Sequence, residues 1–273
     1  MDAYAAAKAR LFFWPELKYA VINMDDVLGV ELSRQLANKT TKIMGYGFRY
    51  PEAGCYSPHF KMLYGSNLKA DIEGIEFDID YEDYHEHLRI GLLGKFNASN
   101  LLAVIAILIA SGIKLSDAVR ALQHVQPIPG RMEKYGGINQ PIIIVDYAHT
   151  PDALEKVLCT LREILRATHQ SKEKVAHNAR LHCVVGCGGD RDKGKRAMVG
   201  GVATRLADAV IFTSDNPRSE EPMNIIKDIV EGVEAENYQI EIDRALAIYQ
   251  AIDNADSGDI VLIAGKGHEK FQE

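Results

Sequence analysis

Glycine-rich segments with charged side chains follow three apolar runs in the last third of the chain. They read GCGGDRDKGKR, DNPRSEEP and GKGHE, and they begin at residues 186, 215 and 265. The apolar runs are typical of buried strands, and loops that follow parallel strands gather along one edge of a sheet. We therefore expect Arg191, Arg218 and Glu269 to surround one small charged molecule, because guanidinium groups pair with carboxylates and a carboxylate pairs with an ammonium group.

The DNPR segment has the residue types of a rigid binding turn. Pro217 fixes its own φ angle, so Asn216 and Arg218 are held on either side of it. The alternative is a surface turn with an incidental salt bridge, but the position after a buried strand favours a ligand site. In GKGHE, Glu269 suits a ligand ammonium group, whereas Lys266 could bind an anion.

One segment is close to a nucleotide-binding phosphate loop. Residues 189–196 read GDRDKGKR, which nearly matches GxxxxGK[ST], but the last position is Arg196 where a hydroxyl would bind magnesium. A cation there would repel the metal. We interpret the segment as a helix start that could hold an anion, and no other segment fits the phosphate-loop pattern.

Two further segments place polar side chains at strand ends or helix starts. Asp146 ends an apolar run and could bind ribose hydroxyls, and His149 is either a phosphate contact, which we favour, or a capping group. Asn97 is most simply the N-cap of an apolar helix, whereas Asn100 lies one turn inside it and needs a hydrogen-bond partner. Ser116 is expected to cap the following helix.

The pattern of apolar runs predicts an α/β protein with domains at 1–129 and 130–273. The first domain mixes helices and one early strand with antiparallel hairpins, which we expect within 40–94. The segment 126–137, rich in proline and glycine, is the expected linker. In the second domain five apolar strands alternate with helices, which predicts a Rossmann-like sheet covered by helices on both faces.

Composition narrows the classes of function. The 38 acidic and 31 basic residues give a formal net charge of −7 without a sustained basic stripe, which argues against a nucleic-acid partner. No apolar run is long enough to span a bilayer, so no membrane partner is expected. The four cysteines form no CxxC pair, as is typical of reduced thiols in the cytoplasm. The sequence HEH at 85–87 could suggest a metal, but alternation on an exposed strand explains it more simply.

Taken together, these motifs resemble the Mur ligase family, and within it the branch that adds meso-diaminopimelate. The resemblance runs in family order along nearly the whole chain, through DAYAAAKARLF, YAVINMDD, GKFNASNLLA, GRME, DYAHTPDALEKVL, GCGGDRDKGKR, DNPRSEEP and GKGHE. It implies an incomplete, mixed α/β central ATPase domain, followed by a C-terminal Rossmann-like domain without its final segment.

The resemblance also implies roles for individual residues. Lys8 matches a lysine whose carbamate helps to hold magnesium, and His149 is expected to act in catalysis. The nucleotide is expected to contact Asn97, Asn100, Arg131 and Asp146. The diaminopimelate pocket is expected to comprise Arg191, Asp215, Asn216, Pro217, Arg218, Gly265 and Glu269. Lysine lacks the second carboxylate of diaminopimelate and would leave the guanidinium of the DNPR motif unpaired.

The implied reaction is amide formation in peptidoglycan precursor synthesis, in the cytoplasm, with ATP and Mg²⁺. Phosphate transfer to the D-glutamate carboxylate of UDP-MurNAc-L-Ala-D-Glu makes an acyl phosphate, which the amine of meso-diaminopimelate attacks. The family's GTNGKT-type phosphate loop is missing from the sequence, so we expect the chain to be inactive by itself unless an upstream chain carries that loop. The alternatives are a non-catalytic binding remnant of a split or decaying gene and a relative of folylpolyglutamate synthetase.

Overall fold

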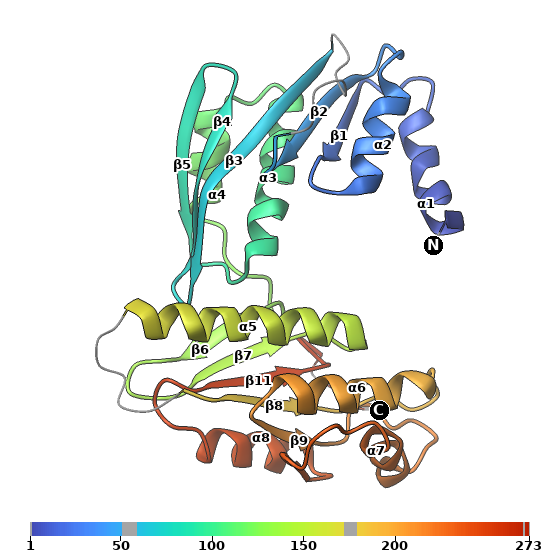
Figure 1. The fold of residues 1–273 in the computed structure, drawn as a ribbon, viewed down its shortest axis with the longest axis vertical. Coiled ribbons are helices and arrows are strands. Elements are labelled where there is room, and N and C mark those ends of the chain that lie inside the picture. Colours follow the sequence, from blue (N-terminus) through green and yellow to red (C-terminus); the bar gives the residue numbers. More distant parts are fainter. Residues whose placement is uncertain (1, 51–58, 172–178, 270, 273) are drawn as a thin grey trace. The chain divides into compact units, whose positions relative to one another are not determined.

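The structure is a computed structural model that describes residues 2–50, 59–171, 179–269 and 271–272. It divides into two compact units, Met1–Gln126 and Pro127–Glu273. The division adjoins the proline-rich segment in which the sequence places a linker. The two units are described separately below (Figure 1).

The first unit is a five-stranded sheet with helices packed on it. Its sheet has the order β1-β2-β3-β4-β5. The elements are α1 (Asp2–Ala9), the 3-10 helix η1 (Arg10–Phe13), β1 (Tyr19–Asn23), α2 (Val27–Leu36), β2 (Lys42–Gly47), β3 (Phe60–Asp71), β4 (Gly74–Tyr81), β5 (Tyr84–Ile90), α3 (Lys95–Ala110) and α4 (Leu115–Leu122).

The pairing of these strands corrects part of the expectation for residues 40–94. The meander β3–β4–β5 is antiparallel, as predicted, but β2 pairs in parallel with both β1 and β3. Parallel neighbours need a crossover rather than a hairpin, and α2 provides one between β1 and β2. The sheet is therefore mixed.

Helices pack against both faces of this sheet. Leu102 and Ile105 of α3 are fully buried against residues of β3, β4 and β5. On the other face, Leu32 and Leu36 of α2 pack with Ile22 of β1. Successive strand residues point to opposite faces, which is why two separate cores form in one unit.

Both N-cap residues that we predicted in this unit, Asn97 and Ser116, are wrong. Gly94 is the N-cap of α3, and its φ of 89° is a conformation that favours glycine. Asn97 lies in the first turn, where its Nδ2 donates to the Leu93 carbonyl (2.8 Å). Lys114, rather than Ser116, is the N-cap of α4, because the helix already begins at Leu115.

The second unit is a six-stranded sheet of order β10-β9-β8-β11-β7-β6. β6 pairs antiparallel with β7, and the other strand pairs in this sheet are parallel. The elements are β6 (Glu133–Gly136), β7 (Ile142–Asp146), α5 (Pro151–Ser171), β8 (Leu181–Val185), α6 (Gly194–Leu206), β9 (Ala209–Phe212), α7 (Pro222–Val230), β10 (Tyr238–Ile240), α8 (Arg244–Asp253) and β11 (Ile260–Ala264). β6 lies inside the predicted linker, so that part of the segment is sheet.

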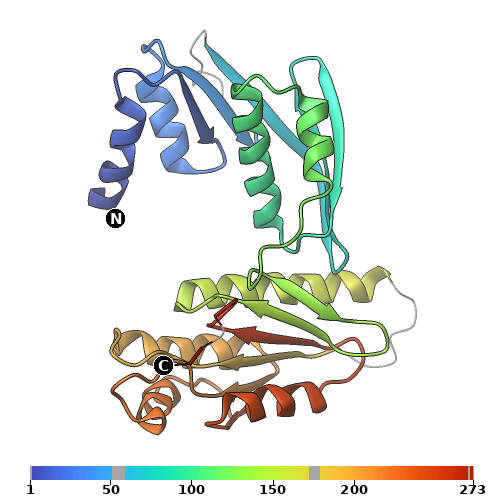
Figure 2. The ribbon, with the colours of Figure 1, turned by 180° about the vertical axis from the view of Figure 1, so that it is seen from behind.

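Helices cover both faces of this sheet, as a Rossmann-like fold requires. α5, α6 and α7 pack side by side on one face, and α8 lies on the other (Figures 1 and 2). Ala247 and Ala251 of α8 are buried against Val184, Ile211 and Val261 of the three central strands. The continuous apolar strands of the sequence thus reflect burial on two sides.

Candidate functional site

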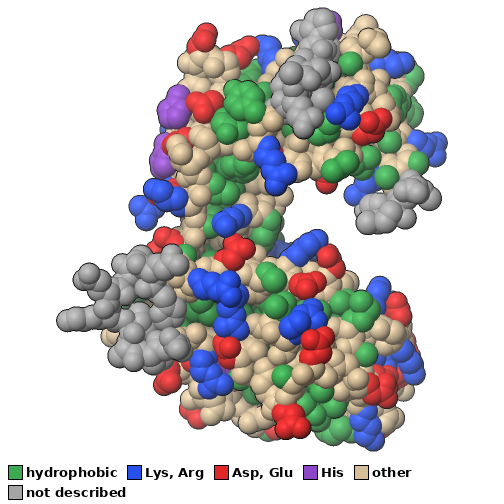
Figure 3. Space-filling model, in the orientation of Figure 1, with side chains coloured by type: hydrophobic (Ala, Val, Ile, Leu, Met, Phe, Trp, Pro, Cys, Tyr) green, Lys and Arg blue, Asp and Glu red, His purple; other side chains and the backbone are tan. Residues whose placement is uncertain are grey.

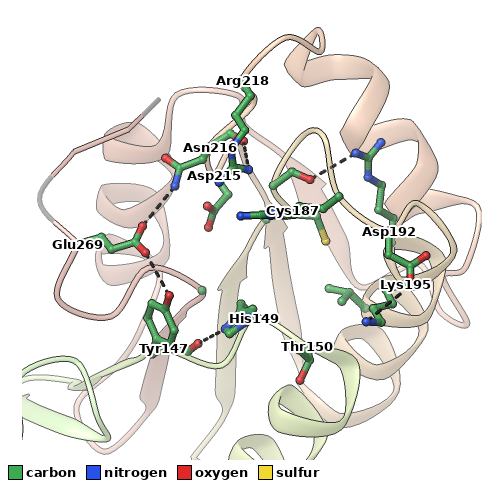
Figure 4. Close-up of a pocket in the computed structure, with 16 residues that line it drawn as sticks. Tyr147, His149, Thr150, Cys187, Asp192, Lys195, Asp215, Asn216, Arg218 and Glu269 are labelled. Carbon is green, nitrogen blue, oxygen red and sulfur yellow. Dashed lines mark hydrogen bonds and ion pairs between the residues drawn. The ribbon is translucent and has the colours of Figure 1, made fainter.

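Four loops at the carboxyl edge of the second sheet enclose a cavity of about 390 Å³ (Figure 4). They follow β7, β8, β9 and β11, which run parallel and therefore end at the same edge. The volume lies within the range of about 300–1,000 Å³ that is usual for small-molecule sites. The lining residues are Tyr147, His149, Thr150, Gly186, Cys187, Gly188, Arg191, Asp192, Lys195, Arg196, Val199, Asp215, Asn216, Arg218, Gly265 and Glu269.

The convergence of Arg191, Arg218 and Glu269 on one cavity is as the sequence predicts. Arg218 lies at one side of the pocket and Glu269 at another in Figure 4, and Arg191 comes from the loop after β8. The lining of the pocket contains cations and carboxylates together. Lys195 also lines it, and so does Asp215 from the loop after β9. A lining of mixed charge suits a zwitterion better than a simple anion.

Arg218 is held by backbone carbonyls. Its Nη1 donates to Gly189 O (2.8 Å) and to Asn216 O (3.5 Å). Gly189 N–H also donates to Asn216 O (2.8 Å), so the loops after β8 and β9 are joined at this point. A side chain at Gly189 would collide with the Pro217 carbonyl oxygen, so only glycine permits this approach.

Glu269 is fixed by three side chains. Asn216 Nδ2 donates to Oε2 (3.2 Å), Tyr147 Oη donates to Oε1 (3.3 Å), and Lys266 Nζ lies 3.5 Å from Oε2. Burial opposes ionisation, but the hydrogen bond from Asn216 and the charge of Lys266 outweigh it and lower the pKa of Glu269. The carboxylate is therefore ionised at neutral pH, ready for a cationic group.

The sequence suggested that Lys266 could bind an anion, but the structure shows its side chain buried and bonded within the protein. It is 8% exposed, and its Nζ donates to Asn216 Oδ1 (2.7 Å). With Glu269, which is exposed, it forms a small network centred on Asn216, so its ammonium group is engaged within the protein. The remaining predicted pocket residues lie close by: Asp215 and Gly265 line the cavity, and Pro217 packs on Gly189.

Sequence reasoning missed the role of Arg196. The side chain is 1% exposed, and its two terminal nitrogens pair with both oxygens of Glu220 (2.7 and 2.9 Å) and with Asp228 (2.8 Å). Arg196 therefore joins α6 to the DNPRSEEP loop and to α7. The acidic residues after DNPR could have indicated a partner for Arg196. They lie too far from Arg196 along the chain for the sequence to show the pairing.

Arg244 is a second missed residue near the pocket. Its Nη2 donates to Ala264 O (2.9 Å) and its Nη1 to Ser214 O (3.5 Å), so it joins the ends of β9 and β11. Burial lowers the pKa of Arg244, and Asp215 partly offsets this effect. The guanidinium thus adds positive charge next to a predicted ligand residue.

The loop after β7 places His149 in the pocket, and Arg131, which precedes β6, contacts Tyr147 of the same loop. His149 Nδ1 lies 2.9 Å from Tyr147 O, and the carbonyl can only accept, so Nδ1 carries the proton and Nε2 is an acceptor in the neutral ring. The Arg131 guanidinium stacks over the Tyr147 ring at 4.7 Å. Either side chain is exposed enough to contact a ligand.

Asp146 is more deeply engaged than a ribose contact would require. Its oxygens accept from the N–H groups of Met132 (2.9 Å) and Ala148 (2.8 Å), and it is 7% exposed. Burial raises the pKa of Asp146 despite these hydrogen bonds. It joins the start of β6 to the end of β7, and this structural role was not foreseen.

The three predicted site residues of the first unit lie on two helices. Lys8 is exposed on α1. Asn100 Nδ2 donates to Asn97 Oδ1 (3.2 Å) at the start of α3, so the partner that a polar amide at this position needs is the neighbouring asparagine. These residues belong to a different unit from the pocket and are not assigned to it.

Among the described residues, no group of three or more His, Cys, Asp or Glu side chains could hold a metal ion. His85 and His87 on β5 pair with Asp80 and Asp78 of the adjacent strand, at 2.7 Å each. Across the described part of the chain, no helix is both long and apolar enough to cross a membrane. On the face shown in Figure 3, basic and acidic side chains are interspersed.

Comparison with known proteins matches both units of the chain to domains of Mur ligases. The Mur ligase middle domain matches residues 1–108, and the glutamate ligase domain of Mur ligases matches residues 130–267. A UDP-N-acetylmuramoyl-L-alanyl-D-glutamate–2,6-diaminopimelate ligase of Nitrosomonas europaea is 56% identical over 274 residues, covering 100% of this chain and 53% of that protein. A ligase with the same name from Chromobacterium violaceum is 45% identical, with 100% and 51% covered.

Solved structures agree with these relatives. One structure of a UDP-N-acetylmuramoyl-L-alanyl-D-glutamate–2,6-diaminopimelate ligase has a TM-score of 0.63 and 36% identity, covering 100% of this chain and 52% of that one. A D-alanyl-D-alanyl-adding ligase of Acinetobacter baumannii, at 17% identity and a TM-score of 0.65, shares the fold. This chain spans about half the length of the curated relatives it matches. Because these family models match both of its units, the chain belongs to the Mur ligase family.

Proposed function

We propose that this chain is part of an ATP-dependent ligase that joins meso-diaminopimelate to the D-glutamate carboxylate of UDP-MurNAc-L-Ala-D-Glu in the cytoplasm. The observation that carries the proposal is the meeting of Arg191, Arg218 and Glu269 in one cavity. Diaminopimelate has an amino-acid group at each end. One end would bind in this pocket while the amine of the other end reacts.

The arrangement of the pocket supports selection of diaminopimelate over lysine. Arg218 would pair with the distal carboxylate and Glu269 with the distal ammonium group. Lysine would satisfy Glu269 but not Arg218, whose guanidinium would have given up water without gaining a carboxylate. Asn216, buried between them, fixes their spacing through its hydrogen bonds.

The ATP-dependent part of the reaction is proposed from the family membership. Asn97, Asn100, Arg131 and Asp146 are the proposed nucleotide contacts, and His149, with its acceptor Nε2, is the proposed contact near the reacting phosphate. The sequence has no GxxxxGK[ST] segment, so we propose that the triphosphate is held by residues outside this chain.

Magnesium would neutralise phosphate charge in such a reaction. The described residues do not form a donor set for it, and Lys8 would contribute only as a carbamate, which adds a carboxylate to its exposed side chain.

The test is an NMR titration of the ¹⁵N-labelled chain with meso-diaminopimelate and, separately, with lysine. We expect diaminopimelate to bind more tightly, and Arg218→Ala to weaken it by about tenfold or more, since hydrogen bonds between charged groups contribute about 1.5–3 kcal/mol. Arg205→Ala is the matched control, because Arg205 pairs with Glu155 and Glu234 away from the cavity. Equal binding of the two ligands would reject the proposal.

The missing phosphate-loop pattern favours one alternative, a non-catalytic binding remnant. The two proposals differ in a complementation test. This chain would be expressed together with a segment that carries a GxxxxGK[ST] loop, in a strain that lacks its diaminopimelate-adding ligase. Restored growth would reject the remnant, whereas failure to restore growth while diaminopimelate still binds would favour it.

A further inference from the structure

The loops that carry Arg191 and Arg218 are joined by contacts that no ligand role explains. The Ser219 hydroxyl donates to Asp190 Oδ1 (2.7 Å), and the Ser219 N–H donates to Asp190 Oδ2 (3.3 Å). The Asp190 N–H in turn donates to Glu220 Oε1 (2.7 Å). Asp190 precedes Arg191 and Ser219 follows Arg218, so the connection lies next to both arginines.

The backbone at these positions needs external support. Asp190 and Arg218 have φ angles of 52° and 51°, the left-handed conformation that residues other than glycine keep only when their surroundings hold them. The hydrogen bonds from Ser219 also lower the pKa of Asp190, so the acceptor is a carboxylate at neutral pH. A charge-assisted cross-link therefore holds two strained positions together.

The cross-link also bears on the direction of the Arg218 side chain. Arg218 Nη1 is held by the carbonyl of Gly189, which directly precedes Asp190. If the Asp190–Ser219 contact were broken, this carbonyl and the Arg218 backbone could move apart. The guanidinium would then have to be ordered at the moment of binding, which costs affinity.

We propose that Asp190 and Ser219 are positioning residues that hold Arg218 in place for the distal carboxylate of the amino acid. They thereby set the preference for diaminopimelate over lysine. This inference rests on the proposed function of the same pocket. Neither residue lines the cavity, so neither is expected to touch the ligand.

The experiment compares the Kd of meso-diaminopimelate and of lysine by NMR titration in Ser219→Ala and Asp190→Ala. Loss of one such contact should raise the Kd of diaminopimelate about three- to tenfold and leave that of lysine unchanged. Ser219→Thr keeps the hydroxyl and should restore wild-type affinity. Ser257→Ala is the matched control, since Ser257 is exposed and precedes β11 at the opposite edge of the sheet.

The outcomes separate this inference from the proposed function. An unchanged ratio of the two Kd values in both variants, or an equal rise for both ligands, would overturn the positioning role. Wild-type protein that does not distinguish the ligands would reject the proposed function instead. Thermal melting checks that each variant folds. If Asp190→Ala does not fold, Asp190→Asn, which removes the charge but keeps the shape of the side chain, takes its place.

Discussion

Replacing Gly189 with alanine should separate the two loops that carry the arginines. The added Cβ would lie 1.9 Å from the Pro217 carbonyl oxygen, whereas ordinary contact begins at 3.4 Å, so the loops would have to part by about 1.5 Å. The obstacle is backbone and cannot rotate away. The bond from Gly189 N–H to Asn216 O, now 2.8 Å, would be lengthened beyond hydrogen-bonding range.

We expect the free energy of unfolding of the second unit to fall by about 2–4 kcal/mol. About 1 kcal/mol is lost with each of two hydrogen bonds, the one to Asn216 O and the one from Arg218 to Gly189 O, and the displacement of packed loops adds a similar amount. Gly194→Ala is the matched control. Its Cβ would meet only the flexible Asp192 side chain, at 3.3 Å, and alanine suits helix α6 better than glycine.

Urea denaturation followed by far-UV circular dichroism measures the change, and hydrogen exchange in peptides spanning β8 and β9 locates it. Diaminopimelate binding should fall along with stability in Gly189→Ala, because Arg218 loses its acceptor. The reasoning is refuted if Gly189→Ala stays within about 0.5 kcal/mol of wild type, or if Gly194→Ala costs as much.

Two other predictions concern titratable groups. Hydrogen bonds from Arg196 hold the pKa of Glu220 at about 2, below its ordinary value of 4.5, so this contribution to stability is complete above pH 4.5 and is lost as the pH falls towards 2. Glu220→Gln should thus be less stable than wild type at pH 7 in urea denaturation, and a difference that does not shrink below pH 4.5 would contradict the assignment. In a Cys55→Ser background, iodoacetamide at pH 8 should label the exposed Cys159 well before Cys187, because burial raises the pKa of Cys187 to about 12. Mass spectrometry of the labelled peptides measures both rates, and faster labelling of Cys187 would show the pocket to be more open than described.

The sheet of the second unit could be predicted because its signals are local. Each central strand is a short apolar run with a glycine or a charged residue within the next three positions, and the parallel arrangement then brings the loops to one edge. The parallel pairing of β2 in the first unit could not be predicted in this way. Alternating residues indicate a strand with one exposed face, but they do not say which neighbour it pairs with or in which direction.

A residue of the pocket could be predicted only where its charge and its position after a strand were enough to indicate its role. Arg218 and Glu269 are charged groups in loops that follow strands, and the sequence identified both. Arg196 pairs with residues 24 and 32 positions away, and that pairing depends on the path of two loops. Asp146 has the residue type of a ligand contact, yet it accepts two backbone N–H groups, because burial makes unpaired N–H groups costly.

The contacts within the pocket suggest how it could distinguish two similar amino acids. Glu269 is held by Tyr147, Asn216 and Lys266, and Arg218 lies on the Gly189 carbonyl, so the pair is ordered before any ligand arrives. An ordered pair costs little further entropy on binding, and its spacing cannot adapt to a ligand with only one of the two charges. Under the proposed function, the preference for diaminopimelate would therefore arise from the rigidity of the loops as well as from the charge of Arg218. A guanidinium of the same charge on a flexible loop should bind both amino acids with more similar affinities.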